Sequence, residues 1–405
     1  MASINIKLYT ICFLDAVTVG FILPILSYHI FALGGSHTTL GVLGSFYAAF
    51  QIISGPLIRT WRDTLGKKFA LLCSLFINFI TYLPLGITTS SAIIVLLRVV
   101  CALTNQTQTL CKAFVVESSP QEKHASVYNV MNALSVAGFV IGPIIGGQIY
   151  ELENGFYYIS MLASLMLAIC LLICLTLPTT SISTSSDNQT TFLQKIKEDI
   201  EYSLSNLQSI NMHQQWDVIM LRSLYHISIT VFFIKFSMLL KLHYSASATI
   251  VGYTYGYQSI LTFLSLFVVA FIKQKSSTDF FISSLFAVTL GFFGLCYAST
   301  YDNYLIIFIP TVITHTLING NWKQLFKLRS TKEHNIEAAE ETVAKIVGII
   351  TPIIFGIFCD LYGHYALKAF VILPLIFDIF VTLVFNSNVA KMVIEKEKVT
   401  EKKED

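Results

Sequence analysis

The chain has 405 residues, of which 54 % are hydrophobic and only 12 % are charged. Because a soluble protein carries roughly 25 % charged residues, this composition excludes an ordinary soluble chain, and its hydrophobicity excludes a disordered one. The 26 basic and 24 acidic residues leave a net charge of +2, which argues against nucleic-acid binding through a basic surface. The class that remains is a polytopic membrane protein.

Apolar runs long enough to cross a bilayer recur along the chain. A membrane helix needs roughly 20 apolar residues. Twelve runs qualify: 8–28, 39–58, 69–88, 92–116, 127–149, 157–177, 218–240, 249–272, 280–299, 304–321, 342–361 and 366–386. They are continuously apolar, which argues against a β-barrel. The first run lacks a small-residue cleavage site, so we expect it to remain as a helix. The sequence therefore predicts an all-α polytopic membrane protein with twelve transmembrane helices.

The distribution of lysine and arginine predicts the orientation of these spans. If the N-terminus is cytosolic, most basic residues fall in cytosolic loops and in the tail, and only Lys241 and Lys368 lie on the other side. This asymmetry predicts that both termini are cytosolic. It leaves open whether the membrane is the plasma membrane or that of an organelle.

A polar stretch divides the spans into two sets of six. We expect a six-helix bundle over 1–178, a cytosolic linker over 179–216, a second six-helix bundle over 217–388 and a charged cytosolic tail over 389–405. Leu193, Ile196 and Ile200 at helical spacing predict an amphipathic helix in the linker, with a solvated linker helix as the alternative. Two such bundles around a central pathway are the plan of many secondary transporters.

The eight cysteines form no CxxC pair and predict neither a metal site nor a disulfide framework.

The first predicted span contains Asp15 about two turns from its cytosolic end. A charged group there raises the insertion free energy by roughly 2.5–3.5 kcal/mol, so Asp15 should face the bundle interior. Gly20 permits close helix approach, and Pro24 favours a kink. We favour a proton- or cation-responsive carboxylate; the alternative is a structural carboxylate paired with a basic residue.

The fourth span offers Asp15 a partner. One helix face carries five residues that recur at helical spacing, with Gln106 and Gln108 adding polar surface nearby: Arg98, Ala102, Asn105, Thr109 and Lys112. A nearby guanidinium favours the charged form of a carboxylate, whereas burial disfavours it. A cavity that opens and closes around an Asp15–Arg98 pair would therefore load and release a proton. The alternative is an ion pair that only fixes the bundle.

Small residues and a loop motif complete the candidate features. Gly138, Gly142 and Gly146 are four apart in the fifth span and form a stripe for close helix packing. Gly147 follows the last glycine of this stripe, and Pro143 introduces a bend. After the second span come Asp63, Gly66, Lys67 and Lys68. Gly66 permits a tight turn, Asp63 suits a helix N-terminus, and the two lysines should stay in the cytosol.

These motifs together resemble the major facilitator superfamily, and within it the tetracycline-resistance-type drug:proton antiporters. The segment from Asp15 to Pro24 is similar to the family's first-span signature, Arg98 to its fourth-span arginine, and Gly138 to Gly147 to its glycine–proline antiporter motif. The loop after the second span is similar to the latter part of the loop motif. Two departures are Arg59 and Ala102, where that family usually has glycine.

Within the superfamily, the closest resemblance is to the animal group called major facilitator superfamily domain-containing protein 9. It rests on the run from Glu151 to Tyr157 and on Trp216 to Ile219 leading to Arg222. Tyr47 and Gln51 in the second span also match the family habit. The resemblance is strongest in the first half of the chain.

The resemblance implies a twelve-helix major facilitator fold that transports a small organic solute by alternating access. It implies that Asp15 carries the coupled proton with Arg98 as its partner, that Asp63, Gly66, Lys67 and Lys68 steady a cytosolic gate, and that the cavity is lined by Tyr47, Gln51, Asn105 and Gln106. No cofactor beyond a proton gradient, no nucleic acid and a monomeric chain are expected. The alternatives are a facilitative uniporter without proton coupling and a non-transporting membrane partner or sensor. An enzyme is not expected, since no nucleophile–base set, metal spacing or phosphate loop occurs.

The second half carries ionisable residues that these motifs leave unassigned. We expect Arg222 and Lys235, near the ends of the seventh span, to snorkel towards the membrane surfaces. His226 and His315 should either titrate near neutrality or form hydrogen bonds within the bundle. Asp378 lies deep in the twelfth span, which is commonly peripheral in this fold, so we expect no functional role for it.

Overall fold

The computed structural model describes residues 2–118, 120–178, 194, 197, 198, 201, 205, 212–272, 278–329 and 336–384. Within these ranges the chain forms long helices joined by short turns, and twelve segments are long and apolar enough to cross a membrane. The predicted all-α fold with twelve membrane helices is thereby confirmed.

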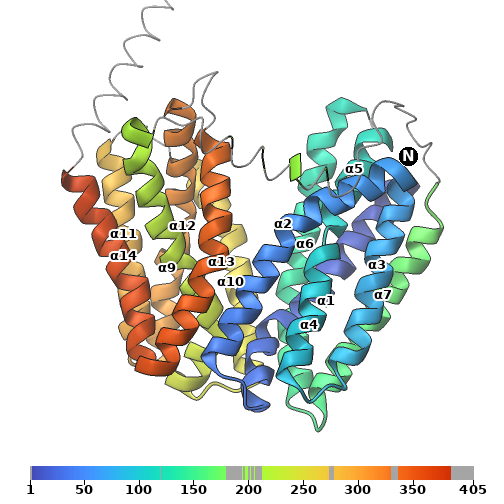
Figure 1. The fold of residues 1–405 in the computed structure, drawn as a ribbon, viewed down its shortest axis with the longest axis horizontal. Helices are drawn as coiled ribbons and strands as arrows, with labels where there is room; N and C mark the ends of the chain where they lie inside the picture. Colours follow the sequence, from blue (N-terminus) through green and yellow to red (C-terminus); the bar gives the residue numbers. More distant parts are fainter. Residues whose placement is uncertain are drawn as a thin grey trace, which may run out of the picture. The chain divides into compact units, whose positions relative to one another are not determined.

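The helices follow the predicted spans and usually extend beyond them (Figure 1). The first half contains α1 Ala2–Ala32, α2 His37–Leu65, α3 Lys67–Leu85, α4 Ser91–Thr104, α5 Thr107–Ser118, α6 Gln121–Tyr150 and α7 Gly155–Leu175. The second half contains α9 Met212–Tyr244, α10 Ala248–Phe271, α11 Thr278–Tyr297, α12 Tyr301–Arg329, α13 Ile336–Tyr362 and α14 His364–Val384.

Local sequence explains where several helices begin and end. Ser36 and Thr39 form a capping box at the start of α2, since the Ser36 side chain accepts from the Thr39 N–H at 3.2 Å and Thr39 Oγ1 accepts from the Ser36 N–H at 3.3 Å. Gly66 separates α2 from α3 with a φ of 87°, a conformation that glycine adopts without steric strain. The turn before α7 likewise places Asn154 at a φ of 57°.

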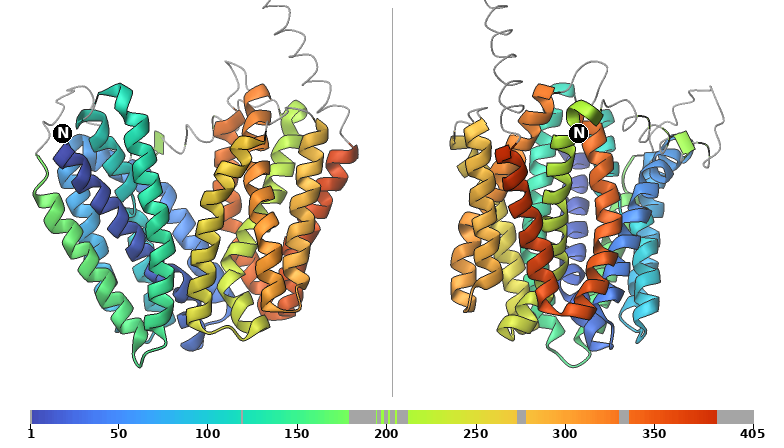
Figure 2. Two further views of the ribbon diagram at one scale, coloured as in Figure 1. Left: turned by 180° about the vertical axis from the view of Figure 1, so that it is seen from behind. Right: turned by 60° about the vertical axis from the view of Figure 1, so that its left-hand side comes forward.

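The chain folds into two compact units, within each of which the helices run roughly side by side (Figure 2). The first comprises the described part of Met1–Asp199 together with Phe236–Ile260, and the second the described part of Ile200–Lys235 and Leu261–Asp405. The segment Phe236–Ile260 thus packs with the first unit, although we expect it to belong to the second bundle. The boundaries 1–178, 179–216, 217–388 and 389–405 stay predictions, since most of the linker and all of the tail lie outside the described residues.

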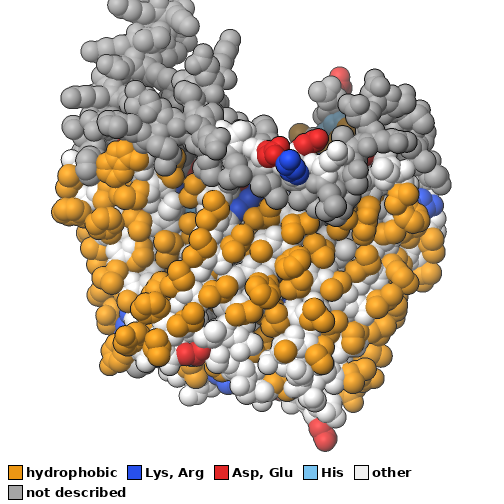
Figure 3. All heavy atoms as spheres, in the orientation of Figure 1, with side chains coloured by type: hydrophobic (Ala, Val, Ile, Leu, Met, Phe, Trp, Pro, Cys, Tyr) orange, Lys and Arg blue, Asp and Glu red, His pale blue; other side chains and the backbone are white. Residues whose placement is uncertain are grey.

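Helix α1 forms the core of the first unit. It packs against α5, α6 and α7, and Leu8, Ile11, Ile22 and Ile25 along it are fully buried. In the second unit α11 packs against α12 and α14, around large buried side chains such as Trp322. Large hydrophobic side chains are also exposed on outward faces, and they dominate the face shown in Figure 3. Such a surface suits a lipid environment.

Candidate functional site

Asp15 lies inside the first unit, on the central helix α1. Its side chain is 5 % exposed, and Thr107 Oγ1 donates a hydrogen bond to Asp15 Oδ1 at 3.2 Å. Thr107 is itself 1 % exposed and is the first residue of α5. The first turn of α5 therefore lies directly against the Asp15 carboxylate.

The start of α5 reaches Asp15 because the fourth span is broken. Asn105 adopts φ −76° and ψ 67°, and the Gln106 N–H donates to the Thr104 carbonyl oxygen at 2.8 Å, which is the geometry of an inverse γ-turn. The Thr104 carbonyl oxygen also accepts from Ser74 Oγ, and Thr104 Oγ1 donates to Asn78 Oδ1 at 2.9 Å. The prediction of one continuous polar helix face from Arg98 to Lys112 is therefore wrong, since α4 ends at Thr104.

Arg98 lies in a separate polar cluster of the same unit. Its side chain is 5 % exposed, Nη1 donates to the Tyr82 hydroxyl at 3.2 Å, and Cζ lies 5.1 Å from the centroid of the Tyr47 ring. Its Nε is buried without a hydrogen-bond partner in the described part of the chain. No ion pair joins Asp15 to Arg98 among the described residues, although Tyr82 lies within electrostatic reach of both. The pairing of Asp15 with Arg98 stays a prediction.

The predicted cavity residues divide among three places. Asn105 Nδ2 donates to the Tyr47 hydroxyl at 2.9 Å, which joins both residues to the Arg98 cluster. Gln106 Oε1 accepts from Thr109 Oγ1 at 2.9 Å, at the start of α5. Gln51 is exposed on α2, one helical turn after Tyr47. The structure therefore joins Tyr47, Asn105 and Arg98 in one cluster.

The glycine stripe of α6 packs against α1. A Cβ at Gly142 would lie 2.7 Å from the Val17 carbonyl oxygen, and one at Gly146 would lie 2.5 Å from that of Phe21. On the α1 side, a Cβ at Gly20 would lie 2.9 Å from Pro143 Cδ. Gly138 makes a similar approach to Ala16, and Gly147 packs against Ala248 and Gly252 of α10. Pro24, near the end of α1, offers its carbonyl oxygen to Ser237 Oγ at 2.8 Å.

The loop motif fixes the ends of neighbouring helices. Asp63 lies in the last turn of α2, where Arg62 Nε contacts Asp63 Oδ1 at 2.9 Å, so Gly66 rather than Asp63 precedes α3. Lys67 Nζ donates to the Ala113 carbonyl oxygen at 3.0 Å. Lys68 Nζ donates to the carbonyl oxygens of Leu175 and Leu177, at 2.8 and 2.6 Å, and so caps the C-terminal end of α7.

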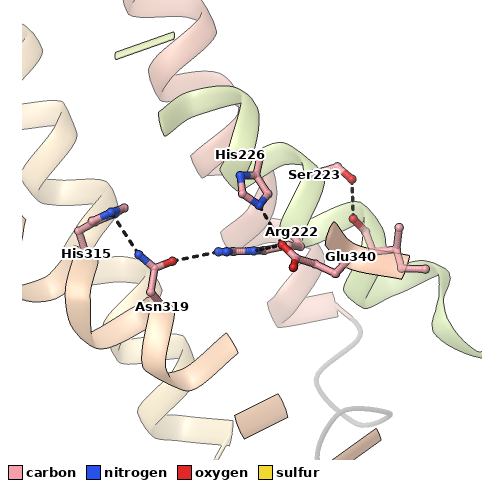
Figure 4. A network of polar contacts seen from close by, with 7 residues as sticks. Arg222, Ser223, His226, His315, Asn319 and Glu340 are labelled. Atoms are coloured by element: carbon pink, nitrogen blue, oxygen red, sulfur yellow. Dashed lines mark hydrogen bonds and ion pairs between the residues drawn. The ribbon is translucent and has the colours of Figure 1, made fainter. Parts of the chain in front are cut away.

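A second polar cluster lies in the second unit and was not predicted (Figure 4). Arg222 Nε lies 2.8 Å from Glu340 Oε1, and His226 Nε2 lies 2.9 Å from the same oxygen. Arg222 Nη1 donates to Asn319 Oδ1 at 3.1 Å. The expected snorkelling of Arg222 is therefore wrong, because its guanidinium is held by α12 and α13. The signal missed in the sequence is Glu340, which lies in a charged, weakly hydrophobic stretch.

Hydrogen-bond direction is fixed along part of this cluster. Arginine only donates, so the Asn319 atom that faces it is the amide oxygen. Asn319 Nδ2 therefore donates to His315 Nε2 at 3.2 Å, which leaves the proton of a neutral His315 on Nδ1, 2.7 Å from the Tyr225 hydroxyl. His226 and His315 thus form hydrogen bonds within the bundle, one of the two expected outcomes.

Two further ionisable residues of the second unit are buried. Lys235 is 4 % exposed and its Nζ lies 3.3 Å from Cys359 Sγ, so the prediction that it snorkels is also wrong. Asp378 is 0 % exposed, and neither of its oxygens has a hydrogen-bond partner in the part of α14 and its surroundings that the structure describes. Within the described ranges no group of three or more His, Cys, Asp or Glu side chains is placed to hold a metal ion.

Parts of this chain are similar in sequence to known proteins. Residues 8–326 match the family described as the Major Facilitator Superfamily. Tetracycline resistance protein, class E, of Escherichia coli is 29 % identical over 146 residues, which cover 35 % of this chain and 36 % of that protein. Quinolone resistance protein NorA of Staphylococcus aureus is 27 % identical over 161 residues, which cover 39 % of this chain and 42 % of NorA. The chain therefore aligns with less than half of the length of these relatives.

Solved structures resemble the fold over nearly its whole length. The nucleoside transporter NupG superposes with a TM-score of 0.75 at 14 % identity, covering 95 % of this chain and 98 % of that one. A D-xylose-proton symporter superposes with a TM-score of 0.64 at 13 % identity, covering 93 % and 96 %. At these identities the likeness shows the fold alone. The family match over residues 8–326 shows that the chain belongs to the Major Facilitator Superfamily.

Proposed function

We propose that the protein is a secondary active transporter that moves a small organic solute by alternating access and couples this movement to protons through Asp15. The observation that carries the proposal is a carboxylate 5 % exposed in the central helix of its unit, bonded to Thr107 at a break in the neighbouring span. Ionisable groups inside membrane bundles mark proton and substrate pathways, and transporters often place interrupted helices at their binding sites. The relatives named as resistance proteins and the symporter-like fold support transport.

The proposal also includes the orientation of the chain, its oligomeric state and its driving force. We infer that both termini are cytosolic, that the protein works as a monomer in the lipid bilayer, and that a proton gradient rather than a cofactor drives it. Arg98 is proposed as the residue that pairs with Asp15 in another state of the transport cycle, because Tyr82 already lies within electrostatic reach of both. The likeness to the animal group called major facilitator superfamily domain-containing protein 9 is part of the same proposal. It rests on the run from Glu151 to Tyr157 and on Trp216 to Ile219 leading to Arg222.

The test has two stages because the solute is not identified. First, metabolites retained by cells with and without the protein are compared, which selects a solute. Second, uptake of that solute is measured in proteoliposomes with the pH gradient intact or collapsed. We expect the gradient to drive accumulation in the unaltered protein and in Asp302→Asn, which changes an exposed acid at the start of α12. Asp15→Asn should abolish the effect of the gradient.

Two outcomes would replace the proposal. Flux that is unaffected both by collapse of the gradient and by Asp15→Asn would identify a facilitative uniporter. Ligand-dependent thermal stabilisation by a metabolite that never crosses the liposome membrane would identify a non-transporting sensor.

A further inference from the structure

Arg222, His226 and Glu340 form a site that the proton coupling proposed for Asp15 does not use (Figure 4). Arg222 Nε and His226 Nε2 both point at one oxygen, Glu340 Oε1, at 2.8 and 2.9 Å. None of the three side chains is fully buried: Arg222 is 14 % exposed, Glu340 15 % and His226 26 %. Two nitrogens thus converge on one carboxylate oxygen, and all three side chains are partly accessible to solvent.

The guanidinium is oriented by contacts other than Glu340. Arg222 Nη1 donates to Asn319 Oδ1 at 3.1 Å, and Asn319 is held in turn by His315. The Arg222 Cζ atom also lies 5.5 Å from the Tyr225 ring centroid and 5.6 Å from that of Trp322. Cation–π contacts and a fixed planar fork prepare a guanidinium to bind a carboxylate. Removal of Glu340 would therefore leave the Arg222 guanidinium in place.

We propose that this cluster binds the carboxylate of an organic anion, and that Glu340 occupies the site when no anion is bound. The inference rests on the proposed transport function and names its substrate class. When an anion takes the place of Glu340, a proton joins a Glu340 carboxylate oxygen, and no other covalent bond forms or breaks. The net charge of the cluster is then unchanged, which avoids the free energy of adding an unpaired charge inside the bundle. Anion and proton therefore enter the site together.

The charged and titratable groups around Glu340 come from three further helices. Arg222 and His226 on α9 contact it directly, and His315 on α12 acts through Asn319. Asp378 on α14 is fully buried and interacts electrostatically with Arg222. On α13 itself, Glu341 pairs with Lys345 at 2.8 Å on an exposed face, where Glu341 is 68 % exposed. Glu341→Gln is therefore a matched control: the same substitution one residue away, outside the cluster.

The experiment measures binding of benzoate to the purified full-length protein by thermal shift, with benzamide as the neutral analogue of the same shape. Glu340→Gln removes the competing carboxylate. If Glu340 fills the site more than nine-tenths of the time, its loss tightens benzoate binding about tenfold or more. In the unaltered protein and in Glu341→Gln, benzoate should bind weakly at neutral pH and more tightly as the pH falls. Arg222→Gln should lose benzoate binding.

His226 is present in both proteins, so the difference between the unaltered chain and Glu340→Gln isolates the contribution of Glu340. The proposal is overturned if Glu340→Gln binds benzoate no more tightly than Glu341→Gln, or if benzamide binds as well as benzoate. Both criteria apply even if Arg222→Gln fails to fold. Because binding is measured at equilibrium without a membrane gradient, a negative result rejects the anion site and leaves the liposome test of transport untouched.

Discussion

A single hydroxyl links a break in the backbone to the carboxylate that we assign to proton coupling. Thr107 Oγ1 is the only hydrogen-bond donor to Asp15 within the described residues, at 3.2 Å, and Thr107 is almost completely buried. Thr107 therefore positions the Asp15 carboxylate, and in the proposed function the transported proton binds Asp15 rather than Thr107.

We predict that Thr107→Val, which keeps the shape and removes the donor, moves the pH profile of transport and lowers the free energy of unfolding by about 1–3 kcal/mol, because a buried carboxylate oxygen loses its hydrogen bond. Thr107→Ser restores the hydroxyl and should restore the pH profile. The measurement is proteoliposome flux against pH for the three proteins. A purely structural role for Thr107 would lower flux at every pH without moving the profile.

The sequence predicted that Asp15 is buried in the bundle, which the structure confirms, but it did not predict the contacts of Glu340. The reason for the difference is the range of the contacts. Asp15 stands out because a lone acid in an apolar run has to be buried in the bundle. Glu340 is hidden among other charges at the edge of a span, and its partner Arg222 is distant in the chain. Only the ion pair between Arg222 on α9 and Glu340 on α13 in the folded structure reveals that the two meet.

At the scale of elements, helix α1 depends on the small residues of α6 that face it. The twelve spans could be predicted because hydropathy over 20 residues is a local property. The break at Asn105 could not, because polar side chains on a span also fit a continuous helix with one wet face. Tertiary contacts hold the break in place: Ser74 Oγ donates to the Thr104 carbonyl oxygen, and the side chains of Thr104 and Asn105 bond to Asn78 and Tyr47.

We predict that Gly142→Ala lowers the thermal stability of the protein, because its Cβ would lie 2.7 Å from the Val17 carbonyl oxygen and 2.9 Å from Gly20 Cα, both backbone atoms. Overpacking of this kind destabilises by about 1–3 kcal/mol. The matched control is Gly348→Ala in α13, where a Cβ would meet nothing within 4 Å. There the helix should gain about 0.5–1 kcal/mol. Melting curves in detergent compare the two variants, and equal effects would contradict the close packing.

At the scale of the whole molecule, the segment Phe236–Ile260 is tied to the first unit by a set of polar contacts. Glu151 Oε1 accepts from the Thr249 N–H at the start of α10 at 2.9 Å, and Gln148 Nε2 donates to the Tyr253 hydroxyl at 2.6 Å. Lys241 Nζ lies 3.6 Å from the Tyr28 ring centroid. By the proposed topology these contacts lie at the non-cytosolic end, where a transporter has to open and close.

Glu151 makes its contact with the start of α10 resistant to acid. Hydrogen bonds from the Ser247 side chain and the Thr249 N–H hold the pKa of Glu151 below its ordinary value. A group whose pKa is lowered by its contacts stabilises them at neutral pH and loses that contribution only as the pH falls through the lowered value. The hydrogen bonds between Glu151 and the start of α10 should therefore persist at about pH 5.5, where an unperturbed glutamate is also still mostly ionised.

We predict that spin labels at Leu152→Cys and Ile250→Cys, both exposed positions, report the same distance at neutral pH and at about pH 5.5. Glu151→Gln should lengthen or broaden that distance at both pH values, because the neutral amide caps the positive end of α10 less well than a carboxylate. Glu153→Gln, an exposed glutamate two residues away, is the matched control and should leave the distance unchanged. Opening of the unaltered protein between the two pH values, or equal effects of the two glutamine variants, would show that Glu151 does not hold the segment in place.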